Sequence, residues 1–435
     1  MNARTEERII ELIKREVVPA TGCTEPVAVA LTVAYASSIL PGKVKDIQVK
    51  LSANVLKNAM GVGIPGTGMI GIPIAIALGA VVADPSKDLK VLDGFSQQDF
   101  AKAKAIVEKG MIHVDLKEGD VDKLYIEAIM TDEEGNDAVA IISKKHNALH
   151  KLLLNNVPVH LDHDKHDDEP CETEEEVQDE DITLNFDMVY DFALNAPLEK
   201  ISFILEAAEL NRAASDYSLK GKYGHSVGRM IQGKLGQKYL GNSALTHMLT
   251  YTSSACDARM DGAPVTVMSN SGSGNQGITA TLPVLSFAED EKVSEEKKIR
   301  ALMLSNLMVI YIKQKLGRLS ALCGCVVAAT GSSSGITYLM GGTKQQISYA
   351  IKNMVGNLTG MICDGAKPSC SMKVSSGVSS AMFSALLAME HQVVTSNEGI
   401  VEDDVDKSID NLTSIGREAM EQTDKYVLNI MTHKQ

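Results

Sequence analysis

Tryptophan is absent from the 435-residue chain, and aromatic residues make up only 4% of it. Proteins that bind single-stranded nucleic acid stack bases on aromatic rings inside a basic groove. This chain provides neither feature, because it has 56 acidic against 42 basic residues and a formal net charge of −14. The composition therefore predicts no nucleic-acid partner.

The sequence also has little that would cross or reach a membrane. A long charge-free run, residues 58–83, contains six glycines and two prolines, which favour buried loops and a short helix over a lipid span. The first 17 residues, MNARTEERIIELIKREV, have the pattern of a charged amphipathic helix and no apolar core of a secretory signal. We expect a cytoplasmic protein without a transmembrane segment.

Seven cysteines, an odd number, do not suggest a disulfide framework in a chain of this length. Metal ligands, catalytic thiols and buried apolar residues are the alternatives.

Length alone predicts two or three domains. Residues 162–181 hold twelve carboxylates and one lysine, so the rest of the chain is close to neutral, and we interpret this stretch as a solvated linker. The predicted division is an N-terminal α+β domain over 1–160 that carries Cys23, an acidic linker over 161–185, and a mostly helical domain over 186–435. The predicted fold class is α+β, with the α+β domain followed by a mostly α-helical cluster-binding domain.

Apolar periodicity supports this division. The first half alternates helix patterns (5–17 and 27–40) with strand patterns such as DIQVKLS and LYIEAIM. The second half predicts helices over 186–210, 297–316, 345–353, 381–388 and 404–426, interrupted by loops rich in glycine and serine.

Two stretches match the G-x-G-x-x-G pattern of dinucleotide-binding loops, at Gly61-Gly63-Gly66 and Gly272-Gly274-Gly277. The first follows a helix pattern and contains Pro65, and the second meets Pro283 where a phosphate-binding helix should continue. We therefore do not expect nucleotide binding at either.

Short polar side chains surround the second glycine motif. They could hold a zwitterion or a carboxylate, although a plain solvent loop remains an alternative. The candidate residues for substrate binding are Asn270, Ser271, Ser273 and Asn275, with Ser332, Ser333 and Ser334 as a second set.

A histidine and cysteine pattern in the acidic stretch, His163, His166 and Cys171, superficially resembles a metal site. Charge repulsion around it makes a coincidence the better interpretation.

Four cysteines in the second half lie in polar, glycine-containing segments: Cys323 and Cys325 in SALCGCVV, and Cys363 and Cys370 in MICDGAKPSC. Iron–sulfur clusters use thiolates presented from loops, where backbone N–H groups can donate to sulfur. The spacing is not a compact cluster signature, so cluster ligands and separate packing cysteines both remain open.

Cys23 stands alone in TGCTEPVAVA, just before a predicted helix with Thr24 as a candidate cap. A helix N-terminus stabilises a thiolate, so we expect a lowered pKa and a role as base or nucleophile, against the alternative of a structural cysteine.

TGCTEP, SSACDARMDGAPVTVMSNSGSGNQG, CGCVVAATGSSSG and ICDGAKPSC together resemble the L-cysteine desulfidase family, which is related to the alpha chain of iron–sulfur L-serine dehydratases. The resemblance extends over nearly the whole chain outside the acidic stretch. It implies a 4Fe-4S cluster held by Cys323, Cys363 and Cys370, with Cys23 as the catalytic cysteine. Cys171, Cys256 and Cys325 receive no role in the cluster.

The resemblance implies a lyase that does not use pyridoxal phosphate and converts L-cysteine to pyruvate, ammonia and hydrogen sulfide. The first alternative is L-serine dehydratase. The second is a non-catalytic protein that binds an iron–sulfur cluster or an amino acid. The expected partner is a small amino-acid substrate, and small-residue helices such as 27–36 are compatible with a homo-oligomer.

Overall fold

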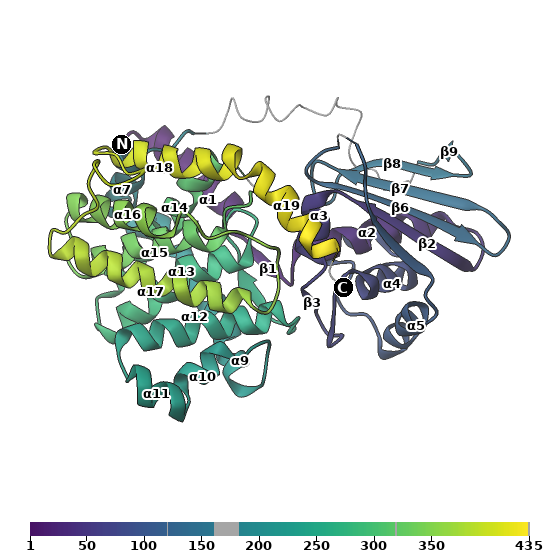
Figure 1. The fold of residues 1–435 in the computed structure, drawn as a ribbon, viewed down its shortest axis with the longest axis horizontal. Coiled ribbons are helices and arrows are strands. Elements are labelled where there is room, and N and C mark those ends of the chain that lie inside the picture. The colour runs from purple at the N-terminus through teal and green to yellow at the C-terminus, as the bar shows by residue number, and fades with distance from the viewer. Residues whose placement is uncertain (120, 161–181, 318–319, 434–435) are drawn as a thin grey trace.

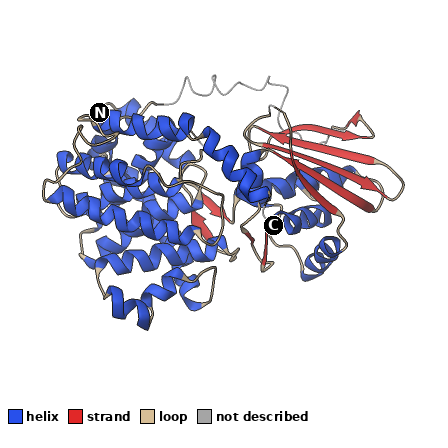
Figure 2. Cartoon of the chain, in the orientation of Figure 1, coloured by secondary structure: helices blue, strands red, loops and turns tan. Residues whose placement is uncertain are grey.

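The computed structural model describes residues 1–119, 121–160, 182–317 and 320–433. Its two parts lie side by side: a helical body, and a smaller α+β part that contains a curved sheet (Figures 1 and 2). Most of the predicted acidic linker 161–185, with the pattern His163, His166 and Cys171, lies outside the described residues. The predicted α+β class is confirmed, with an α+β region followed by a mostly helical region.

One six-stranded sheet forms the scaffold of the α+β part. Its strand order is β5-β2-β6-β7-β8-β9, in which β2 and β5 run parallel and every other pair is antiparallel. Alternate residues of β6 are buried, as expected for a strand with one face on a core. The strands are β2 (Val44–Leu51), β5 (Ile112–Leu116), β6 (Tyr125–Asp132), β7 (Asp137–Ser143), β8 (Leu149–Leu154) and β9 (Val157–Pro158).

Helix α2 (Thr24–Ile39) lies between this sheet and helix α4 (Ile72–Val82). It is apolar around almost its whole circumference, which suits a helix with a partner on each side. Gly79 of α4 packs directly on α2, where an added Cβ would lie 2.3 Å from the Ala30 carbonyl oxygen. The remaining elements of this part are α3 (Ala53–Ala59), β3 (Gly63–Ile64), β4 (Met69–Ile70), η1 (Pro85–Lys90) and α5 (Gln97–Glu108).

The helical body is built around α15 (Gly324–Leu339), which packs against α13, α14, α16 and α17. Glycines let these helices approach closely: a Cβ at Gly331 would lie 2.5 Å from the Ser305 carbonyl oxygen of α14. The other elements of the body are α7 (Phe186–Asn195), α8 (Leu198–Ile201), η2 (Ser202–Ile204), α9 (Leu205–Lys220), α10 (Val227–Gln232), α11 (Lys234–Leu240), α12 (Ala244–Met260), β10 (Thr266–Met268), α13 (Gly274–Asp290), α14 (Glu295–Leu316), α16 (Lys344–Leu358), α17 (Cys370–Met389), α18 (Val405–Ser414) and η3 (Ile415–Ala419).

The two ends of the chain cross between the parts. Helix α1 (Ala3–Glu16) inserts Ile9, Leu12 and Ile13 into the core of the helical body, and strand β1 (Pro19–Thr21) pairs with β10 of that body. Helix α19 (Glu421–Thr432) leaves the helical body and packs on α3 of the α+β part (Figure 1). The division at residue 160 stays a prediction, and α1 packs with the helical body rather than with the sheet.

Two expectations about local structure are wrong. Helix α13 continues through Pro283, so this proline does not end it. The segment ATGSSSG belongs to α15 and is not a loop, because its small residues fit where neighbouring helices press closest.

Helix α17 is, among the described residues, the one helix long and apolar enough to cross a membrane by length and composition. Core helices of soluble proteins pass the same test, and α17 packs against α12, α15 and α16. We therefore assign it to the helical body.

Candidate active site

Cys23 lies where the chain passes from the helical body into the α+β part. Strand β1 pairs antiparallel with β10, with Pro19 opposite Met268, and the Ser271 N–H donates to the Glu16 carbonyl oxygen at 2.9 Å. These bonds fix the chain on both sides of β1. Cys23 follows two residues later, as the N-cap residue of α2, and is buried.

The Arg259 guanidinium, from the last turn of α12, lies against this turn. Its Nη2 donates to the Gly22 carbonyl oxygen at 3.1 Å, and its Nη1 donates to Asn275 Oδ1 at 3.1 Å. The positive charge of Arg259 also lowers the pKa of the Cys23 thiol, although burial outweighs it. Gly274 makes room for it, because a Cβ there would lie 2.2 Å from Arg259 Nε. The second glycine motif therefore accommodates a buried arginine.

The expected lowering of the Cys23 pKa is wrong. Burial raises the pKa of the thiol to about 11, and this effect outweighs the lowering influence of Arg259. The side chain of Cys23 makes no capping hydrogen bond to α2. A helix N-terminus contributes a limited stabilisation of negative charge, whereas complete loss of solvent costs more.

Cys323 and Cys363 are held together by an isolated β-bridge between Leu322 and Ile362. The Cys323 N–H donates to the Met361 carbonyl oxygen at 2.9 Å, and the Cys363 N–H donates to the Ala321 carbonyl oxygen at 2.6 Å. Cys323 is the N-cap residue of α15, and Cys370 is the first residue of α17. The structure thus brings two separate loops and two helix N-termini to one place.

The thiols influence one another's ionisation. Burial is the largest cause of a raised pKa at Cys323, to about 12, and Cys363 and Cys370 raise it further. Burial also raises the pKa of Cys370, and Cys363 adds to this. Cys370 in turn raises the pKa of Cys23. Cys23, Cys323, Cys363 and Cys370 are therefore linked in series by charge interactions between their thiols.

The loop between Cys363 and Cys370 contains one carboxylate, Asp364, which pairs with two lysines. Lys367 Nζ lies 2.6 Å from Asp364 Oδ1, and Lys373 pairs with the same carboxylate and donates to the Ile362 carbonyl oxygen at 2.9 Å. Burial opposes ionisation of Asp364, but its hydrogen bonds to the two lysines prevail and bring its pKa to about 2. Lys373 also favours ionisation of Cys323 and Cys370.

Cys325 and Cys256 lie close to the same thiols, because, besides burial, the charge of Cys370 raises the pKa of both. The Cys325 thiol donates to the Lys373 carbonyl oxygen at 3.1 Å and packs on Gly377, where a Cβ would lie 2.5 Å from the sulfur. Cys256 is completely buried in the core, and burial raises its pKa well above the usual value. Both thiols are buried, and their exclusion from the predicted ligand set stays a prediction.

In the described ranges, no group of three His, Cys, Asp or Glu side chains converges on a single metal ion. A 4Fe-4S cluster makes a different demand, because each thiolate binds its own iron and the sulfurs stand correspondingly farther apart. Cys323, Cys363 and Cys370 offer three thiols from adjoining segments, with cationic Lys373 nearby to offset thiolate charge. This donor set fits a cluster.

The predicted substrate-binding residues divide into two kinds. Asn270 is fully buried, and its amide donates to the backbone and side-chain oxygens of Asn306, while Ser271 donates to Asn270 Oδ1. Ser273 caps α13 by accepting from the Gln276 N–H at 3.4 Å. Of the four, Asn275 lies beside the Cys23 turn, through its bond to Arg259.

The second set, Ser332, Ser333 and Ser334, is fully buried within α15. Each hydroxyl donates to a backbone carbonyl oxygen, of Ala329, Ala381 and Thr330 respectively. Ser332 and Ser334 thus bond within α15, Ser333 joins α15 to α17, and none of the three lines a loop.

A family comparison gives this geometry its context. A model of the serine dehydratase alpha chain matches residues 86–429. The chain belongs to the serine dehydratase alpha chain family. The match includes Cys323, Cys363 and Cys370, whereas Cys23 lies before it. Membership of this family supports a lyase-type role related to dehydration.

Curated relatives extend over the whole chain. A UPF0597 protein of Porphyromonas gingivalis is 68% identical, and one of Parabacteroides distasonis is 60% identical, both over 100% of each chain. A UPF0597 protein of Photobacterium profundum is 46% identical over 98% of each chain. The Cys23 segment, outside the family match, is therefore inside the range shared with these relatives.

Glycines allow the helical body and the α+β part to pack closely around the cysteines. A Cβ at Gly63 would lie 2.2 Å from the Asp261 carbonyl carbon, and one at Gly365 would lie 2.1 Å from the Lys57 carbonyl oxygen. A Cβ at Gly61 would lie 3.2 Å from the Ala366 carbonyl oxygen. Within the first glycine motif, Gly61 thus packs against the loop that carries Cys363 and Cys370, and Gly63 packs against the turn at Asp261.

Sequence reasoning missed Arg259 and Asp257. Burial raises the pKa of Asp257 to about 6; its Oδ2 accepts from the Gly228 N–H at 3.1 Å, and its Oδ1 is buried without a partner. The available signal was the string CDARMD, which ends a helix of small and apolar residues with two buried charges.

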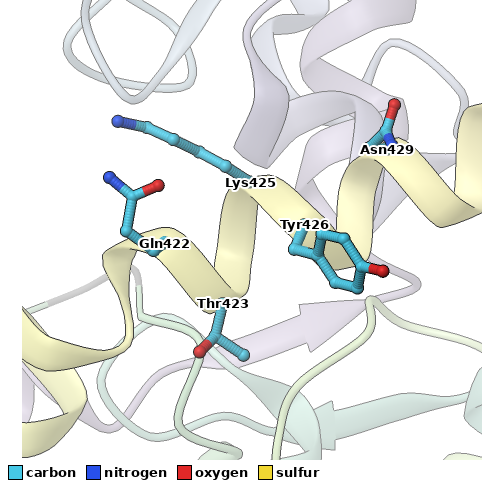
Figure 3. A pocket seen from close by; sticks show the side chains of 5 residues that line it. All are labelled: Gln422, Thr423, Lys425, Tyr426 and Asn429. Carbon is cyan, nitrogen blue, oxygen red and sulfur yellow. The ribbon is translucent and has the colours of Figure 1, made fainter.

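A separate pocket on the protein surface is lined by Gln422, Thr423, Lys425, Tyr426 and Asn429. All five belong to α19, and Figure 3 shows that their side chains point in different directions rather than converging. The pocket contains none of the candidate site residues.

Proposed function

We propose that the chain is an iron–sulfur-dependent L-cysteine desulfidase that converts L-cysteine to pyruvate, ammonia and hydrogen sulfide without pyridoxal phosphate. The supporting observation is that Cys23, a candidate base, lies within electrostatic reach of Cys370 in the group of Cys323, Cys363 and Cys370. A proton acceptor and a cluster-binding donor set would then act on one small substrate.

In this proposal, Cys323, Cys363 and Cys370 hold a 4Fe-4S cluster. Three ligands for four irons would leave one iron without a protein ligand. When the cluster is bound, this iron would supply Lewis-acid assistance to the departing group. The Lys367 and Lys373 ammonium groups reduce the cost of bringing thiolates together in a buried place.

Cys23 acts as the base. Its high pKa makes its thiolate a strong proton acceptor, and Arg259 is the adjacent group that favours this ionised form. The thiolate takes the Cα proton, and the β-carbon–sulfur bond breaks with its electron pair leaving on sulfur. The aminoacrylate product gains a proton at carbon to become an imine, and water hydrolyses the imine to pyruvate and ammonia.

L-serine dehydratase is the second candidate, favoured by the description of the matching family. The same proton abstraction would then expel hydroxide in place of sulfide. We expect the enzyme to act on a small molecule in the cytoplasm in either case.

Anaerobic reconstitution with iron and sulfide, followed by parallel assays on L-cysteine and L-serine, tests the proposal. Equal amounts of sulfide and pyruvate from L-cysteine, lost in Cys23→Ala without loss of cluster absorbance, are the expected result. Pyruvate from L-serine alone would establish the dehydratase. A reconstituted protein that converts neither substrate would favour the non-catalytic alternative.

A further inference from the structure

Arg259 carries a positive charge that the described protein does not neutralise with a carboxylate. The residue is 6% exposed, and among the described residues no carboxylate oxygen lies within ion-pair distance of its guanidinium. Its oxygen partners are two neutral groups, the Gly22 carbonyl and Asn275 Oδ1, and Nε has no partner at all. Burying such a charge without a counter-ion is costly, so the site is suited to receive an anion.

The position of this charge defines which anion would fit. In an α-amino acid the carboxylate is bonded to Cα, the atom from which the base removes a proton. A base at Cys23 therefore brings the substrate carboxylate into the immediate surroundings of Cys23, where Arg259 lies. A guanidinium presents five N–H donors in a planar fork that matches the two oxygens of a carboxylate.

We propose that Arg259 binds the α-carboxylate of the substrate and thereby selects free amino acids over their amides and esters. This inference rests on the proposed function for the identity of the base. It adds a substrate-recognition role for an arginine of the helical body, presented to a cysteine at the entrance of the α+β part.

Gly274 supports this assignment because its lack of a side chain leaves room for the Arg259 guanidinium. A methyl group at this position would overlap Arg259 Nε, so Gly274→Ala is expected to displace the guanidinium without removing it. The Gly274→Ala and Arg259→Gln variants should therefore share one defect.

The experiment measures how ligands protect Cys23 from iodoacetamide in reconstituted protein at pH 7, where the amino groups of both ligands are protonated, with peptide mass spectrometry as the readout. L-Alanine has no leaving group and is not consumed, and L-alaninamide lacks only the carboxylate charge. We expect L-alanine to slow Cys23 alkylation at least tenfold more effectively than L-alaninamide in the wild type. Arg259→Gln and Gly274→Ala should lose this preference, and Arg259→Lys should keep part of it.

Arg229→Gln is the matched control, because Arg229 donates to the Gly221 carbonyl oxygen outside the Cys23 turn. Ratios with and without ligand cancel any effect of a variant on the intrinsic reactivity of the thiol. Equal protection by both ligands, absence of protection in the wild type, or full preference retained in Arg259→Gln would overturn the inference.

The result is separable from the fate of the proposed function. Carboxylate-dependent protection in a protein that converts neither L-cysteine nor L-serine would uphold Arg259 and reject the lyase. A second comparison measures how much Arg259→Gln reduces the turnover of L-cysteine and of its methyl ester. The same reduction for both substrates would show that Arg259 only positions the Cys23 turn. A reduction at least thirtyfold greater for L-cysteine supports carboxylate binding.

Discussion

Lys57 of α3 and Asp424 of α19 form an ion pair that joins the last helix of the chain to the α+β part. The Lys57 side chain is only 2% exposed, and its backbone carbonyl lies against Gly365 of the cysteine loop. Helix α19 therefore holds α3 in the position where α3 supports the candidate active site.

Asp424→Ala should destabilise the protein by about 3 kcal/mol, because it leaves the Lys57 ammonium buried without its counter-ion. Chemical denaturation followed by circular dichroism measures the loss. Glu421→Ala is the control on the same helix: its partner Lys425 is 62% exposed, so the free energy of unfolding should stay close to that of the wild type. The double variant Lys57→Met/Asp424→Leu should recover most of the stability. Equal effects of Asp424→Ala and Glu421→Ala would show that the pair contributes little.

Gly63→Ala should separate the two parts of the chain where they touch. The new methyl group would overlap the Asp261 backbone, and relieving the overlap should cost about 2 kcal/mol of stability. Gly360→Ala, where an added Cβ meets nothing within 4 Å, is the control and should leave the melting temperature nearly unchanged. Both variants are compared by thermal denaturation and by turnover of L-cysteine. If the Gly63→Ala protein is as stable as the Gly360→Ala protein, the backbone at Asp261 can move away from the new methyl group at little cost in stability.

The sequence predicted the elements that follow from local pattern. Alternation of apolar and polar residues predicted strands of the sheet, and apolar residues spaced three or four positions apart predicted most helices of the second half. It failed at residues 324–339, where glycine and serine suggest a loop in isolation but fit a helix that is packed on all sides. Propensity carries no information about how closely a neighbouring helix approaches.

The candidate site shows the same division. The residue pattern singled out Cys323, Cys325, Cys363 and Cys370 and left their role open. The family resemblance selected Cys323, Cys363 and Cys370, and this ligand set stays a prediction. The pKa of Cys23 could not be predicted, since its burial depends on tertiary contacts of this turn: Pro65 lies against Gly22, and Arg259 reaches the Gly22 carbonyl oxygen from α12. Arg259 was hidden for the same reason: its contact with Gly22 depends on the pairing of β1 with β10.

Replacing the proposed cluster ligands one at a time should separate them from the packing cysteines. Cys323→Ser, Cys363→Ser and Cys370→Ser should each reduce iron well below about four per chain after reconstitution, because a lost thiolate frees one corner of the cluster. Visible absorbance and iron analysis report the loss. Cys325→Ala is the matched control, two residues from Cys323, and should keep its iron because its thiol bonds the Lys373 carbonyl instead. Loss of iron in Cys325→Ala with retention in Cys323→Ser would exchange the two assignments.

The reactivity of Cys23 should rise steeply with pH. Its pKa is raised by burial from the ordinary 9.0 to about 11, so the thiolate fraction and the rate of alkylation should grow about tenfold per pH unit between pH 7 and 10. Because the folded state binds this proton more tightly than the unfolded state, the associated stability is fully present below pH 9 and is lost as the pH rises toward 11. Arg259→Gln removes the positive charge that favours the thiolate, so its alkylation at pH 9 should be slower than in the wild type. Iodoacetamide labelling of cluster-free protein measures both rates, and the buried Cys256 peptide serves as the unreactive standard. A labelling midpoint at or below pH 9 would show that the thiol is solvated in solution, and the base would then be an ordinary exposed cysteine rather than a buried one activated by Arg259.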